Sequence, residues 1–234
     1  MTADSGASGH APSRGARGGG KAPAVRRNAG PRSRPMDSEA RWEEIIAASA
    51  TIFMENGYEA TSLQDIASAV GILKGSIYYY IKTKEDLLYE LVDRALSLYA
   101  ATVDEDPSLA AAPAPVRLRT FLVQWMTISA QEREWCIVAE RSFNRLSPER
   151  LASVIERRDR YSAFVKDIIQ QGVDEGTFDP EVDVSLATIT VFELIKGSNE
   201  WHHPGGRLSM EAISEWTADF VIRGLGGTIA RPAG

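Results

Sequence analysis

The sequence predicts an all-α protein of about nine helices, divided between a small N-terminal domain and a larger C-terminal one. Apolar residues recur every three or four positions along most of the 234-residue chain, which is the spacing of one helix face. No stretch alternates apolar and polar residues with the period of two that a half-buried strand shows. Glycine and proline interrupt the helical pattern at intervals typical of loops between helices.

The chain begins with residues 1–36, which show no helical pattern. This segment is rich in glycine, serine, alanine and proline, and residues 1–35 carry seven cations against one anion, Asp4. Such a composition buries too little apolar surface to offset the entropy lost on ordering. We therefore expect a disordered, basic tail.

The first helix is expected over Asp37–Asn56, and Gly57 closes it. It begins a predicted domain that spans residues 37–84. The residues that recur along one side of this helix form its expected buried face: Trp42, Ile45, Ile46, Ser49, Ile52 and Phe53.

Two short helices joined by a tight turn are expected next, over about residues 62–81. Thr61 and Ser62 can cap the first of them, because their hydroxyls accept the free N–H groups of a first helical turn. A small residue, Ala67, is followed by Gly71 after four positions and by Ile77 after six more. This spacing is the helix-turn-helix pattern of DNA-binding proteins.

The outer face of the second short helix supports the DNA-binding interpretation over an ordinary helical hairpin, because it is polar, aromatic and cationic. We expect Lys74, Tyr78 and Lys84 to contact phosphates, and Ser76 and Tyr79 to lie nearest the base edges. Replacing Lys84 by alanine would then lower the slope of log affinity against log salt concentration by about one. The full set of predicted DNA contacts is Thr61, Ser62, Lys74, Gly75, Ser76, Tyr78, Tyr79, Tyr80 and Lys84.

A fourth helix is expected after Thr83 as N-cap, and it begins the second predicted domain, residues 85–228. Three prolines between residues 104 and 115 indicate a loop. Beyond this loop we expect five helices, over about residues 116–130, 133–145, 148–175, 182–202 and 209–226.

The stretch from Lys74 to Ile81, followed by Thr83 to Leu88, resembles the signature of the TetR family of bacterial repressors. The segment from Ile45 to Leu63 also fits the first helix and turn of that family. The resemblance implies a homodimer that binds a palindromic DNA operator and a C-terminal domain that binds an effector.

Two later stretches, Gly172 to Val184 and Trp201 to Gly206, are similar to TetR-type regulators of cholesterol-ring degradation, whose effectors are CoA thioesters. This similarity implies a small hydrophobic effector, with a CoA thioester as one candidate. It also places Lys196 at a ligand-contacting position. Arginines that would suit CoA phosphates are Arg141, Arg145, Arg157 and Arg158. The predicted ligand contacts are Phe121, Trp125, Trp135, Arg141, Arg157, Tyr161, Phe164 and Lys196.

The last two helices carry apolar residues on more than one side, which is typical of a surface buried against a second copy of the chain. The predicted dimer interface consists of Leu186, Ile189, Phe192, Ile213, Trp216 and Phe220.

Composition narrows the functional classes. The net charge is −6, so cationic side chains near the helix-turn-helix would confine DNA to that face of an otherwise acidic protein. No apolar run reaches the roughly 18 residues of a membrane helix, and the single Cys136 suits a reducing compartment, so we expect a cytoplasmic protein.

No catalytic, cofactor-binding or metal-binding pattern is evident. Two alternatives to a ligand-released repressor stay open: a ligand-independent DNA organiser and, less favoured, an acyl-CoA-handling enzyme.

Overall fold

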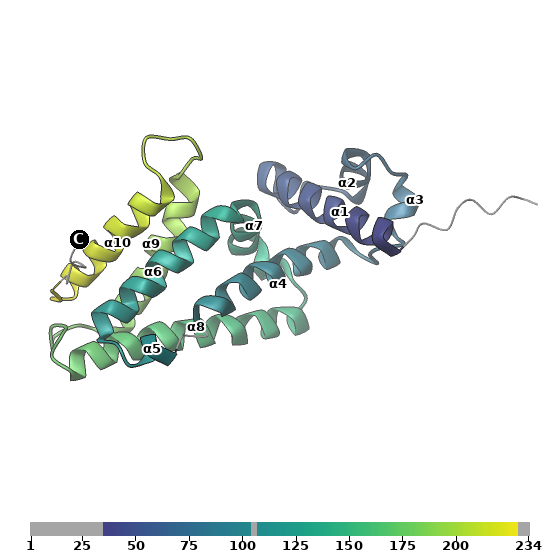
Figure 1. The fold of residues 1–234 in the computed structure, drawn as a ribbon. Helices are drawn as coiled ribbons and strands as arrows, with labels where there is room; N and C mark the ends of the chain where they lie inside the picture. The colour runs from purple at the N-terminus through teal and green to yellow at the C-terminus, as the bar shows by residue number, and fades with distance from the viewer. Residues whose placement is uncertain (1–34, 104–106, 229–234) are drawn as a thin grey trace, which may run out of the picture.

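The computed structural model describes residues 35–103 and 107–228, and all regular structure in these ranges is helical. Most of the predicted tail therefore lies outside the described residues. Three helices make up the N-terminal domain: α1 (Pro35–Asn56), α2 (Leu63–Ala69) and α3 (Lys74–Ile77). They group at one end of the molecule, with α3 outermost (Figure 1).

Local chemistry explains where α2 begins and ends. Ser62 is its N-cap and forms a capping box with Asp65, in which each side chain binds the other residue's backbone N–H. Thr61 does not cap the helix as expected, because its buried hydroxyl donates to the carbonyl of Gly57 at 2.9 Å. Gly71 follows α2 with a φ of 68°, a left-handed conformation that glycine adopts most readily and that ends the helix.

The helix α3 is shorter than expected and ends at Ile77, so Ile81 lies beyond it. The N–H groups of Tyr79 and Tyr80 bond to carbonyls three residues back. This bonding tightens the chain into turns instead of continuing the α-helix.

The larger domain contains α4 (Lys84–Val103), α5 (Pro107–Ala110), α6 (Ala114–Gln131), α7 (Arg133–Ser142), α8 (Pro148–Asp174), α9 (Val184–Trp201) and α10 (Met210–Gly224). Two predictions need correction. The expected loop of residues 104–115 contains the single turn α5, and the helix expected over 133–145 ends in a 3₁₀ turn, η1 (Phe143–Arg145).

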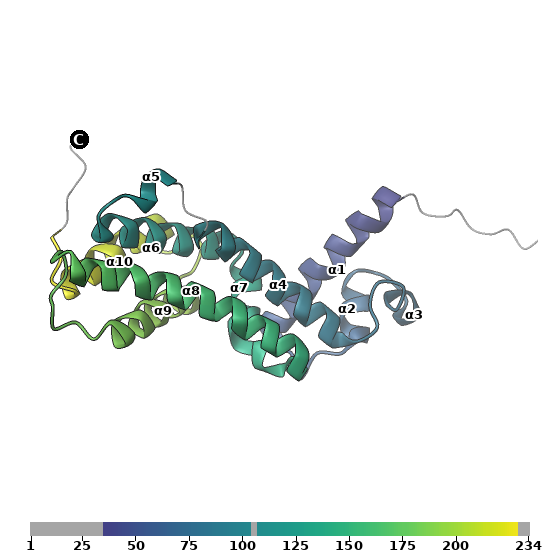
Figure 2. The same cartoon turned by 90° about the horizontal axis from the view of Figure 1, so that it is seen from below.

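The helix α4 leads from the N-terminal domain into the larger one and lies beside α8 in both views (Figures 1 and 2). Leu87 and Leu91 near its start and Leu96 and Tyr99 toward its end are buried, so α4 belongs to the core at both ends of the molecule. On the far side, α10 packs along α6. No described helix is long and apolar enough to cross a membrane.

Candidate functional site

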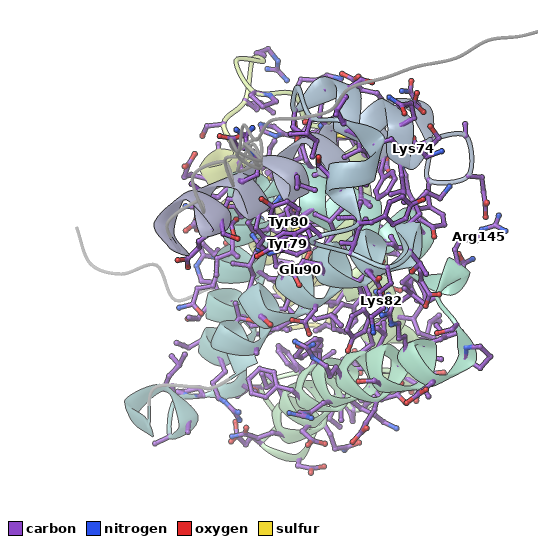
Figure 3. The ribbon with its side chains drawn as sticks, turned by 90° about the vertical axis from the view of Figure 1, so that its right-hand side faces the viewer. Lys74, Tyr79, Tyr80, Lys82, Glu90 and Arg145 are labelled. Atoms are coloured by element: carbon purple, nitrogen blue, oxygen red, sulfur yellow. The ribbon has the colours of Figure 1, made fainter. Side chains whose placement is uncertain are left out.

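The outer surface of the helix-turn-helix exposes large side chains that nothing in the described chain covers. Leu73 and Tyr79 are 80% and 79% exposed, and Lys74, Ser76 and Tyr78 are exposed beside them. Figure 3 shows Lys74, Tyr79 and Lys82 from the end of the molecule that carries this domain. Exposed aromatic, hydroxyl and cationic groups on α3 and the turn that follows it, at one tip of the molecule, suit contact with DNA grooves and phosphates.

The helix α3 is held on α2 by tight packing. Ala67 and Ile77 are fully buried, and the N–H of Ile72 bonds to the Ala67 carbonyl at 2.9 Å. A Cβ placed on Gly75 would meet nothing within 4 Å. This glycine therefore leaves room for close approach from outside.

Four of the predicted DNA contacts have partners within the protein. Ser62, the first of them, is the N-cap bonded to Asp65. Thr61 is buried, and the half-buried ring of Tyr80 stacks on Trp42 at 6.5 Å between centroids. The Lys84 ammonium donates to the carbonyls of Tyr58 and Thr61 at 2.7 and 2.8 Å, with a longer bond to Glu59 at 3.3 Å. This is a correction to the expectation that Lys84 is free to contact a phosphate. Lys82, absent from the predicted set, is exposed instead.

A cavity of about 260 Å³ lies among α4, α6, α7, α8 and α9. Its aromatic wall is formed by Tyr99, Trp125, Tyr161 and Phe192, with the Tyr99 and Trp125 rings stacked at 3.9 Å. Tyr161 and Phe192 meet Trp125 edge-on, at 5.5 and 5.6 Å between centroids. A smaller cavity of about 60 Å³ shares Trp125 and Phe192 and adds Ile195, Lys196 and Asn199. Together they form one aromatic pocket, the kind of site that takes an apolar ligand.

The charged groups of the aromatic pocket are largely paired with one another. Arg158 donates to Glu140 at 2.7 and 3.2 Å, and the Lys196 ammonium contacts Glu193 at 2.6 Å. Asp159 adds a third carboxylate to the lining. The pocket therefore contains three carboxylates and two cations, and both cations are already neutralised.

The predicted ligand contacts divide into three groups. Trp125 and Tyr161 line the aromatic pocket, and Lys196 lies at its smaller end. Phe121 and Phe164 form a layer behind them, with the Phe121 ring 5.2 Å from Trp125. The remaining three lie elsewhere and pack or pair within the protein: Trp135 against Arg94, Arg141 with Glu200, and Arg157 with Asp93.

The predicted ligand contacts left out most of the lining of the aromatic pocket, including Tyr99, Glu140 and Glu193. Tyr99 continues the buried stripe of α4 one turn beyond Ala95, so its helical spacing was a usable signal. Glu140 and Glu193 gave no such signal, because an acidic residue on a helix is ordinarily on a solvated face.

Two larger cavities are less suited than the aromatic pocket to an apolar ligand. One, of about 420 Å³, lies between the start of α6 and the end of α10 and contains no aromatic side chain. The other, of about 450 Å³, lies between the α1–α2 turn and α7, where charged residues such as Glu59, Arg141 and Arg145 line it. Among the described residues, no three His, Cys, Asp or Glu side chains gather as metal ligands.

The predicted dimer residues differ in how exposed they are on the single subunit. Leu186 and Ile189 on α9 are exposed, as are Trp216 and Phe220 on α10, whose rings stack at 5.3 Å. Ile213 is only 5% exposed and belongs to the subunit core. Its burial is a correction to the expectation that it lies at the interface. Phe192 is half-buried and, like Ile189, lines the aromatic pocket, so its place at the interface stays a prediction.

Comparison with known proteins agrees with this architecture. Residues 45–91 match the family model of bacterial regulatory proteins of the tetR family, and residues 111–225 match the tetracyclin repressor-like C-terminal domain. The HTH-type transcriptional repressor KstR2 of Mycolicibacterium smegmatis is 28% identical over 192 residues, which cover 82% of this chain and 93% of KstR2.

Two solved structures extend the comparison. PfmR, a TetR family regulator from Thermus thermophilus, is 32% identical with a TM-score of 0.70 and covers 77% of this chain and 98% of its own. AibR, solved with isovaleryl coenzyme A and operator DNA, has a TM-score of 0.68 and covers 77% of this chain and 97% of its own. At 24% identity, AibR shows a shared fold alone.

Proposed function

Because this chain belongs to the TetR family of bacterial transcriptional regulators, we propose that it represses transcription as a homodimer on a palindromic operator until a hydrophobic effector releases it. The observation that carries this proposal is the aromatic pocket, which opens against α4. The first turn of the same helix directly follows the helix-turn-helix. A ligand in the pocket therefore contacts the helix that carries the DNA-binding domain.

The DNA-binding part of the proposal places α3 in the major groove. Tyr79 and Ser76 would face base edges, and Lys74, Tyr78 and Lys82 would face phosphates. Lys84 and Thr61 would support this surface from inside, because their polar groups are bonded to the protein's own carbonyls.

The proposed dimer joins α9 and α10 to the same helices of a second copy. The exposed apolar side chains on these helices, Leu186, Ile189, Trp216 and Phe220, are unusual for a free surface and would be buried by a two-fold partner.

The proposed effector would bury an uncharged apolar group in the aromatic pocket. Burying roughly 200–300 Å² of apolar surface would contribute about 5–8 kcal/mol before the costs of binding, at about 25 cal/mol per Å². A free carboxylate would have to compete with Glu140 and Glu193 for the two cations. A thioester presents the same acyl group without that charge, which favours an acyl-CoA over its free acid.

Release would follow from a population shift. The effector must bind the conformation that fits the operator poorly more tightly than the one that fits it well. Without that difference in affinity, even tight binding would leave the DNA-bound fraction unchanged.

Tryptophan fluorescence tests the effector class, because Trp125 lies in the pocket wall. Isovaleryl coenzyme A and longer acyl-CoAs should change the emission at micromolar concentrations, whereas the matching free acids should act poorly. Glu193→Gln should improve binding of the free acid and leave thioester binding within about twofold. Equal responses to thioester and acid in the unsubstituted protein would remove CoA from the proposal. If neither ligand bound while operator binding persisted, the protein would be a ligand-independent DNA organiser or use another effector.

A further inference from the structure

One carboxylate joins the DNA-binding domain to the effector-binding domain. Oδ2 of Asp86 accepts hydrogen bonds from the backbone N–H groups of Lys82 and Thr83, at 2.9 and 2.8 Å. These two residues form the last turn between α3 and α4. Oδ1 of the same carboxylate accepts from the Arg150 guanidinium of α8 at 2.5 Å. Asp86 therefore holds the end of the helix-turn-helix with one oxygen and α8 with the other.

The neighbouring residues fix the start of α8 on the start of α4. Glu85 accepts from the Ser147 N–H at 2.9 Å and pairs with Arg150 at 3.4 Å. The Arg150 guanidinium also lies over the Tyr89 ring, 4.9 Å from its centroid. Arginine provides several donors in a planar fork, so one side chain can satisfy both carboxylates and the ring.

Lys84, the residue before Glu85, bonds to a second part of the DNA-binding domain. Lys84, directly beside Glu85 and Asp86, donates to the carbonyls of Tyr58 and Thr61 in the α1–α2 turn. The first turn of α4 thus contacts the loop before α2 and the turn after α3. Any displacement of this first turn moves both ends of the helix-turn-helix.

The contact between α4 and α8 runs from this junction to the aromatic pocket. Arg157 pairs with Asp93 at 2.6 Å, and the Tyr161 hydroxyl donates to the Leu96 carbonyl at 2.5 Å. Leu96 and Tyr161 line the pocket. The two helices lie side by side over this distance (Figures 1 and 2). A ligand that separates Leu96 from Tyr161 therefore acts on the same pair of helices that Arg150 and Asp86 hold together.

We propose that Arg150 and Asp86 are positioning residues for operator binding, and that the effector acts on the DNA-binding domain through their contact. The second half of this inference rests on the function proposed above. The first half concerns operator affinity alone and requires no effector.

The charge state of Asp86 supports this role. Desolvation raises the pKa of its carboxyl, but the hydrogen bonds from Arg150, Thr83 and Lys82 outweigh that effect and lower the pKa to about 2. The carboxylate is therefore ionised at neutral pH. Both of its oxygens then act as acceptors.

The test compares Arg150→Gln with Arg157→Gln, a control that removes another α8–α4 ion pair seven residues farther along α8, away from the junction with the DNA-binding domain. The probe is an operator selected from random-sequence DNA with the unsubstituted protein, and its affinity is measured by fluorescence anisotropy. Arg150→Gln should weaken operator binding about tenfold, within the usual range of coupling between sites. Arg157→Gln should change it by less than about twofold. The thermal midpoint of each variant shows whether the loss of operator affinity exceeds what its loss of stability explains.

A double-mutant cycle separates positioning from general destabilisation. Asp86→Asn keeps an acceptor for the turn and removes the charge that Arg150 binds. The double variant Asp86→Asn/Arg150→Gln should bind the operator no more weakly than the weaker single variant. Arg150→Lys should recover part of the affinity, because the charge is kept while the fork is lost. Fully additive losses, or equal losses in Arg150→Gln and Arg157→Gln, would overturn the proposal.

The effector arm uses isovaleryl coenzyme A as the probe. If it releases the unsubstituted protein from DNA, it should release Arg150→Gln at least fivefold less effectively, relative to each variant's own operator affinity. Equal release would overturn the transmission route. If the thioester does not bind the unsubstituted protein, the effector assignment fails, and the double-mutant cycle still decides whether Arg150 and Asp86 position the DNA-binding domain.

Discussion

Cationic side chains around the helix-turn-helix divide into those that face outward and those that hold the domain together. Lys74 and Lys82 are exposed, whereas the Lys84 ammonium is bonded to carbonyls and lies 4.3 Å from the centroid of the Tyr58 ring. Charge alone therefore does not identify a phosphate contact. What matters is whether the donors of the ammonium are already occupied.

Lys74→Ala and Lys84→Ala should consequently differ in salt dependence. Lys74→Ala should weaken binding to all DNA sequences and lower the slope of log affinity against log salt by about 0.9, since one phosphate contact is lost. Lys84→Ala should weaken binding through a loosened α1–α2 turn, lower the thermal midpoint and leave the slope nearly unchanged. Anisotropy titrations at several salt concentrations measure both slopes. A slope lowered equally by Lys84→Ala would restore the original expectation that Lys84 contacts a phosphate.

Sequence reasoning located the helix-turn-helix but could not say which of its polar residues have partners within the protein. The spacing of Ala67, Gly71 and Ile77 predicts the turn because the packing of two adjacent helices is a local property. The bonds of Lys84 reach carbonyls 23 to 26 residues earlier in the chain. Such long-range contacts leave no periodic signature.

The helices were predictable for the same reason, because apolar periodicity and capping residues are local features. The all-α prediction is confirmed, and the unexpected α5 is a single turn. Periodicity could not say which apolar face of α9 or α10 meets the subunit core. Ile213 therefore joined the predicted interface although it is buried in the subunit core.

The exposed rings of α10 provide a test of the proposed dimer. Trp216 is 66% exposed, and a two-fold contact would bury it. Trp216→Glu should raise the monomer–dimer dissociation constant by about thirtyfold or more, because buried aromatic anchors contribute about 2 kcal/mol or more. Sedimentation velocity over a concentration series measures this constant.

Ile155→Glu is the control for that experiment, since Ile155 is an exposed apolar residue on α8, outside the proposed interface. It should leave the association unchanged. A Trp216→Glu protein that dimerises like the unsubstituted one would place the interface elsewhere.

The α4–α8 junction also predicts a pH dependence. The folded-state pKa of Asp86, about 2, lies below its ordinary value of 3.8. Its contribution to stability is therefore fully present above the ordinary value and is lost as the pH falls through about 2. The difference in denaturation midpoint between the unsubstituted protein and Asp86→Asn should be constant from pH 7 to 5 and shrink toward pH 2. A difference that persisted undiminished at pH 2 would contradict the ion-pair interpretation.

Over the full chain, charge is distributed unevenly between the N-terminal tail and the remainder. The net charge is −6 although residues 1–35 are strongly basic. An acidic body repels DNA except at the helix-turn-helix, and a basic segment adjoining that domain would add nonspecific phosphate contacts.

Removal of residues 1–35 should leave a folded dimer that binds the operator more weakly and with a smaller salt slope. Circular dichroism and sedimentation check the fold and association, and anisotropy at several salt concentrations checks the slope. A truncated protein that unfolds or stays monomeric would show that this segment has a structural role.

The proposed repressor mechanism requires that effector binding and operator binding oppose each other in one protein. The most direct measurement is the fluorescence anisotropy of labelled operator bound to the full chain, titrated with an acyl-CoA that quenches Trp125. We expect the anisotropy to fall to the value of free DNA, with a midpoint that rises as operator concentration increases, because linked equilibria are reciprocal. An acyl-CoA that saturates the aromatic pocket while the operator stays fully bound would contradict release by this effector.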